Sequence, residues 1–174
     1  TNLLSSPDLT GNTFTSSVPI YTRAEFVPEL TGNNFTYSGE ATIGIQDTTL
    51  SEDTTWAPMG SVVNYGLQRQ MTIQNDATLT LSSGVKITGG SNDDLYVGSG
   101  TNVGHLVAGG GVTFARPVYF ENGTATVGGS TFVSKLYLSS YASVNIASND
   151  LSRCTVYATG DRYATIPLTG NYWG

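Results

Sequence analysis

The chain has 174 residues, of which 39% are hydrophobic and only 11% are charged. That length suits one domain with a continuous core, whereas a typical soluble domain has roughly 25% charged residues. Lys and Arg number 7 against 13 Asp and Glu, for a net charge of −6, and no basic run provides the clustered positive charge that binds nucleic acid. No apolar stretch approaches the ~18 residues of a membrane span. Thr, Ser, Asn and Gly must cover the surface instead, which is typical of an all-β chain.

A short motif recurs along the chain at a nearly constant interval. LTGNTFT begins at Leu9, LTGNNFT at Leu30 and LTGNYWG at Leu168, while the weaker copies VGGSTFV and IASNDLS begin at Val127 and Ile146. The intervals of 30 − 9 = 21, 146 − 127 = 19 and 168 − 146 = 22 residues are typical of one coil of a β-solenoid. Leucine-rich repeats share this period, but they need several leucines and a helical return in each repeat. This sequence has neither, and we expect no helical periodicity in it.

Two positions of the repeat predict how the coils stack. The fourth position is a small polar residue, which fits a tight turn because asparagine accepts the left-handed conformation. Stacked copies would form a ladder of side-chain amides, with aromatic or aliphatic residues pointing inward two positions later. The predicted turn ladder is Asn12, Asn33, Asn149 and Asn171, with Ser130 in the same position, and the inward residues are Phe14, Phe35, Phe132, Leu151 and Trp173.

The middle of the chain continues the pattern with short strands and glycine turns. From Met71 to Ile87 apolar and polar residues alternate, and the pairs Asn75-Asp76 and Ser83-Gly84 break the segment into strands. This segment, MTIQNDATLTLSSGVKI, together with DLYVGSGTNVGHLVAGGGVTF, resembles the coil motif of right-handed parallel β-helix domains in large bacterial surface proteins. The ending LTGNYWG is similar to the Asn-aromatic-Trp-Gly endings of the pectate-lyase-like superfamily.

The resemblance is clearest from Tyr65 to Phe120 and implies a right-handed parallel β-helix of roughly eight coils of about 20 residues. It implies little about function, because the superfamily includes polysaccharide lyases and hydrolases, adhesins, stalks and modules with no assigned activity. We expect one domain over residues 1–174, a fragment of a longer protein that is secreted or lies at the cell surface.

A polysaccharide lyase of this fold would need a base and a group that neutralises a uronate carboxylate. Asp93 and Asp94 are adjacent, which favours a solvated turn over a calcium site. Asp150 with Arg153, and Asp161 with Arg162, are half a coil apart, since 161 − 150 = 11, so we expect them on different faces as surface ion pairs. Arg116 completes the basic candidates. We therefore predict no catalytic residue, and a polysaccharide lyase or hydrolase stays the alternative.

The remaining reactive side chains favour structural roles. His105 is the only histidine and has no metal-ligand partner at short spacing, so we predict neither a metal nor a cofactor. Cys154 is the only cysteine and has no basic neighbours, which indicates a small buried residue in place of a reactive thiol. Asn34-Phe35-Thr36 and Asn122-Gly123-Thr124 match the N-glycosylation pattern, which matters only in a source that glycosylates.

Tyrosines give the clearest functional prediction. Tyr119 and Tyr137 each lie between core-type residues, which places their side chains outside the solenoid. An exposed column of tyrosines would offer apolar area and hydrogen-bonding tips to a glycan or a surface protein; the structural alternative is that the rings only stabilise the sheet. The predicted binding residues are Tyr96, Tyr119, Tyr137 and Tyr157.

Two further possibilities concern other surfaces. Threonine pairs at Thr78 and Thr80, at Thr124 and Thr126, and at Thr13 and Thr15 suggest a flat array that binds ice or a crystal surface. We expect the pairs not to recur at the coil period, so that the array is broken. Solenoid ends expose unpaired strands, and we expect no helical cap at either end, so coils from neighbouring domains or end-to-end self-association would cover them. The sequence thus predicts an extracellular structural or adhesive module.

Overall fold

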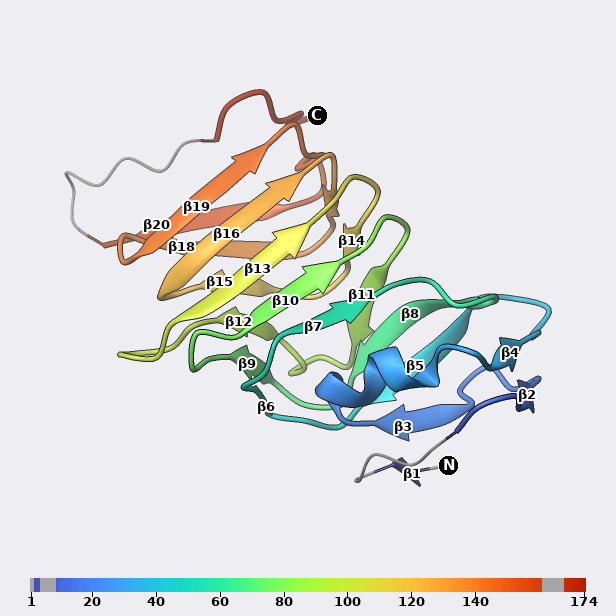
Figure 1. Ribbon diagram of the computed structural model, residues 1–174. Helices are drawn as coiled ribbons and strands as arrows, with labels where there is room; N and C mark the ends of the chain where they lie inside the picture. Colours follow the sequence, from blue (N-terminus) through green and yellow to red (C-terminus); the bar gives the residue numbers. More distant parts are fainter. Residues whose placement is uncertain (1, 4–8, 161–167) are drawn as a thin grey trace.

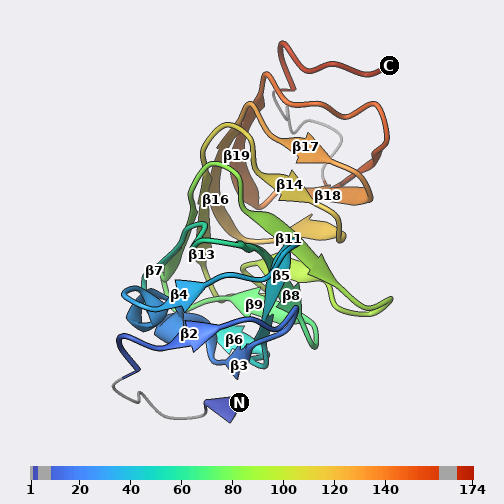
Figure 2. The ribbon, with the colours of Figure 1, turned by 90° about the vertical axis from the view of Figure 1, so that its right-hand side faces the viewer.

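The chain forms a parallel β-solenoid of about seven turns, close to the roughly eight coils predicted. A computed structural model describes residues 2–3, 9–160 and 168–174. Figure 1 shows the turns stacked along one axis, and Figure 2 shows the sheets enclosing the interior. All strand pairs between successive turns are parallel, so each turn advances by one strand spacing of ~4.8 Å. The prediction of an all-β solenoid is confirmed.

The longest sheet has seven strands within the described residues. Its inward column begins with Ile20 and Ile43, passes through Tyr65 and Ile87, and ends in the stacked aromatic residues Phe114 and Phe132. In spatial order the strands are β1 (Asn2–Leu3), β3 (Ile20–Thr22), β5 (Ala41–Ile45), β8 (Val62–Leu67), β11 (Lys86–Gly89), β14 (Thr113–Phe114) and β17 (Thr131–Phe132).

Two shorter sheets close the other sides of the interior. The described residues give the second sheet six strands and the third sheet five, with aliphatic side chains facing inward in both. The six-stranded sheet contains β6 (Thr49–Leu50), β9 (Met71–Ile73), β12 (Leu95–Val97), β15 (Val118–Phe120), β18 (Lys135–Ser139) and β20 (Thr155–Thr159). The five-stranded sheet contains β7 (Thr54–Trp56), β10 (Thr78–Leu81), β13 (Gly104–Ala108), β16 (Gly123–Gly128) and β19 (Ala142–Ala147), and β2 (Thr13–Phe14) pairs separately with β4 (Asn34–Phe35).

The predicted asparagine ladder exists as two separate runs. The Asn33 side-chain oxygen accepts hydrogen bonds from the backbone N–H of Asn12 at 3.0 Å and from its side-chain amide at 3.2 Å. In the second run the Asn171 oxygen accepts from the Asn149 backbone N–H at 2.8 Å, and the Asn149 oxygen accepts from the Ser130 N–H at 2.9 Å. Val112 and Val85 occupy the position of Ser130 in the two preceding coils, so the amides do not form one continuous ladder.

The expected left-handed conformation falls one residue earlier than predicted. Within the described part of the chain the ladder asparagines have negative φ, and the preceding residue has positive φ, as at Gly11 (72°), Gly32 (87°) and Ser148 (59°). The asparagines therefore contribute through their side-chain amides, which hydrogen-bond adjacent coils to each other, and not through their backbone conformation.

The inward aromatic positions are confirmed in part. Phe35 and Phe132 are buried and stack on Phe14 at 5.1 Å and on Phe114 at 4.6 Å between ring centroids. The prediction for Trp173 is wrong, because its side chain is 51% exposed. Its backbone lies beyond the isolated bridge that pairs Asp150 with Tyr172, and no described strand packs over it.

A 3-10 helix, η1 (Ala24–Leu30), contradicts the expectation of no helical cap. It replaces strands in the first turn and packs against β7, the edge strand of the five-stranded sheet. Ala24, Val27 and Leu30 are buried, which makes η1 a cover for that edge. The helix is short and contains Pro28, so it lacks the apolar periodicity that identifies a helix in a sequence.

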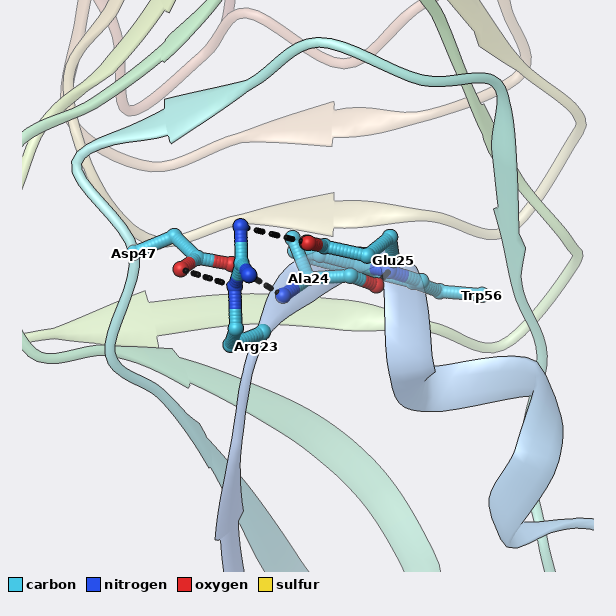
Figure 3. A network of polar contacts seen from close by, with 5 residues as sticks. All are labelled: Arg23, Ala24, Glu25, Asp47 and Trp56. Carbon is cyan, nitrogen blue, oxygen red and sulfur yellow. Dashed lines mark hydrogen bonds and ion pairs between the residues drawn. The ribbon is translucent and has the colours of Figure 1, made fainter. Parts of the chain in front are cut away.

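A polar network fixes the start of η1 (Figure 3). Asp47 accepts from the backbone N–H of Ala24 and from Nε of Arg23 at 3.3 Å, while Arg23 also pairs with Glu25 at 2.6 Å. The Trp56 indole N–H donates to the Ala24 carbonyl at 3.0 Å. Burial raises the pKa of Glu25 above its usual value. Asp47 follows β5 and Trp56 lies in β7. The network therefore joins η1 to the next turn at two places.

We predict that Asn149→Ala lowers the free energy of unfolding by about 3 kcal/mol, because the substitution removes the hydrogen bonds that the buried side chain makes to the Ser130 N–H and to the Val127 and Ala147 carbonyls. Asn12→Ala, at an exposed position of the other run, should cost less than about 1 kcal/mol. Urea unfolding followed by circular dichroism measures both, and equal losses would show that the amide of Asn149 has no special role.

Candidate functional site

The four tyrosines predicted as binding residues form one continuous column on the outer face of the six-stranded sheet. Tyr96, Tyr119, Tyr137 and Tyr157 occupy register positions of β12, β15, β18 and β20. Their successive ring centroids lie 4.2, 4.1 and 4.6 Å apart, and the rings are parallel to within 9°. We call this column the tyrosine ladder. The structure therefore brings together all four residues, because coil stacking places one tyrosine above the next.

Stacking determines which part of each ring can meet a partner. The faces of Tyr119 and Tyr137 are covered by neighbouring rings on both sides, so their edges and hydroxyl groups form the outward surface. Tyr157 is the most exposed member, at 41%. A sugar that stacks on an aromatic face cannot reach the faces of these two rings. A partner that contacts ring edges and accepts hydrogen bonds can reach a continuous row of ring edges and hydroxyl groups.

Charged residues lie beside the start of the ladder. Arg116 pairs with Asp94 at 3.4 Å, and both side chains are less than one-fifth exposed. Asp93 accepts from the backbone N–H of Gly90 at 2.5 Å, and its own carbonyl accepts from Arg116 at 3.4 Å. Asp93 and Asp94 do precede a strand as expected, but the predicted solvated turn is half-buried and tied to the next coil.

Of the other acid and base candidates, the structure describes Asp150 and Arg153. Asp150 accepts from the Ser152 N–H at 2.9 Å, and hydrogen bonding to Ser152 lowers the pKa of its carboxyl group. Arg153 is exposed, and Asp161 and Arg162 lie outside the described residues. Among the residues that the structure describes, no group of three or more His, Cys, Asp or Glu side chains could hold a metal ion, and no helix is long and apolar enough to cross a membrane.

His105 lies in β13 on the outer face of the five-stranded sheet, in agreement with its expected place in a strand. Its Nδ1 is 2.7 Å from the Thr124 hydroxyl and its Nε2 is 3.2 Å from the Asp76 carboxylate. Both ring nitrogens thus have partners in adjacent coils, and the imidazole connects three turns.

The threonine pairs align better than the sequence suggested. Thr78 is in register with His105 and then Thr124, while Thr80 is in register with Val107 and then Thr126. The two pairs therefore occupy the same two columns, two coils apart, with His105 and Val107 between them. The array is therefore interrupted, as expected, because the coil between the two pairs has His105 and Val107 in these columns.

Cys154 is only partly buried, whereas the sequence indicated a buried residue. Burial raises the pKa of the Cys154 thiol to about 11, which favours the protonated thiol at neutral pH. Asn34 of the first glycosylation triplet is exposed, whereas the Asn122 side chain of the second donates to the Gly100 carbonyl at 3.0 Å.

Comparisons of the chain with protein-family models, with curated proteins and with solved structures gave no significant match. The pectate-lyase-like resemblance therefore stays a prediction beyond the solenoid fold, and function has to be argued from the side chains described above.

We predict that the tyrosine ladder makes stability fall in alkaline solution. Desolvation raises the pKa of Tyr96 and of Tyr119 above the usual value of 10.0. The unfolded chain then releases its tyrosine protons first, so stability is complete below about pH 9 and declines as the pH rises above about 10. Urea unfolding at pH 8 and pH 11 should show a smaller decline for Tyr96→Phe/Tyr119→Phe, which keeps the rings and removes the titrating groups. An unchanged decline in the free energy of unfolding would mean that the ladder does not contribute to the alkaline loss of stability. Tyr65→Phe measures the separate contribution of a buried tyrosine to that loss.

Proposed function

We propose that this chain is an extracellular structural and adhesive module, in which the solenoid holds the tyrosine ladder against a protein surface. The observation that supports it is the four-ring column itself, with stacked ring faces and outward edges and hydroxyl groups. Tyrosine is enriched at protein interfaces because it combines apolar area with a hydrogen-bonding tip and has few rotatable bonds.

The surroundings of the ladder agree with a contact role. A ring held on both sides loses little side-chain entropy when a partner binds, so the ladder is organised before binding. Exposed Lys135 precedes Tyr137 by two residues and so lies on the same outer face, while Glu121 follows β15. A partner can therefore meet apolar edges, hydroxyl groups and charges of both signs within one strip.

A polysaccharide lyase or hydrolase of the same fold is the alternative function. Its chemistry requires a free base close to the substrate, whereas Arg116 is engaged by Asp94 and by the backbone of Asp93. No specific observation favours that activity over an adhesive role, and the proposed secreted or cell-surface location is common to both.

We predict that Tyr137→Phe/Tyr157→Phe weakens adhesion of the purified chain to an array of surface proteins by about tenfold, because it removes two hydroxyl groups from the strip and keeps the stacked rings. Thr126→Val, on the five-stranded sheet, is the control and should adhere like the wild type. Thermal unfolding would verify that both variants fold. Adhesion unchanged by loss of the hydroxyl groups contradicts the proposal, and release of unsaturated sugar from a polysaccharide by the wild type would make the enzyme the better assignment.

A further inference from the structure

The five-stranded sheet carries a polar groove that is separate from the tyrosine ladder. The groove has a volume of about 530 Å³, within the range of small-molecule sites. It forms beside β7, the strand against which η1 packs. Its lining residues are Pro28 from η1, Asp53, Thr54 and Thr55 at β7, and Thr78 and Thr80 in β10.

Threonine hydroxyl groups line the outer side of this groove. Thr55 points to the outer face, and Thr80 lies in register with it. Thr78 lies on the same face, two residues before Thr80. Thr54 alternates with Thr55 and is in register with the buried Leu79, so its hydroxyl, which is buried without a hydrogen bond, faces the interior of the solenoid. The outward hydroxyl groups at the groove are therefore those of Thr55, Thr78 and Thr80.

Asp53 defines the charge that a ligand can carry. Its Oδ1 accepts from the Thr78 backbone N–H at 2.7 Å, which holds the exposed carboxylate at the edge of the groove. Among the described residues that line the groove, Asp53 is the only charged one. A uronate or a phosphate would meet repulsion there with no cation to offset it. One carboxylate also falls short of the six to eight oxygen ligands that calcium takes.

Hydroxyl-rich neutral ligands match these features. A carboxylate accepts hydrogen bonds from sugar hydroxyl groups, and threonine hydroxyls both donate and accept. The threonine methyl groups and the Pro28 ring provide apolar contact for the C–H face of a sugar. The groove also opens onto the outer face of the sheet, where His105 and Val107 occupy the same two columns in the next coil. We propose that this groove binds a neutral saccharide, with Asp53 and Thr80 as its principal hydrogen-bonding residues.

This site does not depend on the proposed adhesive role of the tyrosine ladder, because the two surfaces belong to different sheets. It also differs from a uronate-binding lyase site, which requires a cation. The inference therefore concerns a second ligand of a different chemical class.

Isothermal titration calorimetry with a panel of neutral cello-, manno-, xylo- and chito-oligosaccharides tests the proposal, with oligogalacturonate as the acidic comparison. We expect at least one neutral oligosaccharide to bind, and Thr55→Val/Thr80→Val to weaken it by about tenfold or more through loss of two hydroxyl groups with little change in volume. Asp53→Asn should weaken binding while keeping an acceptor for the Thr78 N–H.

Thr126→Val is the matched control, since it removes a hydroxyl from the same column outside the groove. It should bind like the wild type, and so should Tyr137→Phe/Tyr157→Phe, which separates this site from the ladder. Amide NMR spectra would verify that each variant is folded. Absence of binding by the whole neutral panel, stronger binding of oligogalacturonate, or unchanged affinity in Thr55→Val/Thr80→Val would each overturn the proposal.

Discussion

In-register stacking of parallel strands is the interaction on which the rest of this structure depends. Because each turn adds one strand to each sheet at a spacing of ~4.8 Å, a residue type repeated at the coil period becomes a column. Inward columns form the apolar core, and the turn between the five- and seven-stranded sheets carries the asparagine ladders. Outward columns produce the tyrosine ladder and the threonine columns. The tyrosine ladder is thus a direct result of register, and the groove combines register with η1.

The energetics of the columns differ with their place in the turn. Buried amides such as that of Asn149 donate hydrogen bonds to backbone carbonyl groups at the corner of the turn. Stacked rings on the outer face contribute apolar area and favourable ring contacts while remaining partly in water. At the first turn η1 replaces the strand that would pair with β7, and Asp47 and Trp56 hold it there. The edge of the sheet is therefore covered without a further coil.

Much of the fold and of the tyrosine ladder could be predicted from the sequence, because a period of about 20 residues specifies both stacking and register. All four ladder tyrosines were predicted, and Tyr119 and Tyr137 were identified from their positions between core-type residues. The sequence predicted a broken threonine array but not that the two pairs share columns two coils apart, since 106 − 79 = 27 residues separate Leu79 from its register partner Leu106, and no single period describes that coil. The groove was missed for a different reason. It requires η1, and a short segment that contains Pro28 has no helical periodicity by which the sequence could predict a helix.

The central claim, that equivalent residues of successive coils lie directly above one another, can be measured by disulfide trapping. In a Cys154→Ala background, Thr126→Cys/Asn145→Cys places thiols on register partners of adjacent strands β16 and β19, where the Cα atoms lie within the ~4.4–6.8 Å that a disulfide spans. Thr80→Cys/Thr126→Cys places them in the same column two coils apart, beyond that range. Under mild oxidation we predict rapid intramolecular bridging of the first pair and none of the second. Equal bridging of both pairs, or bridging of the second alone, would contradict the stacked register.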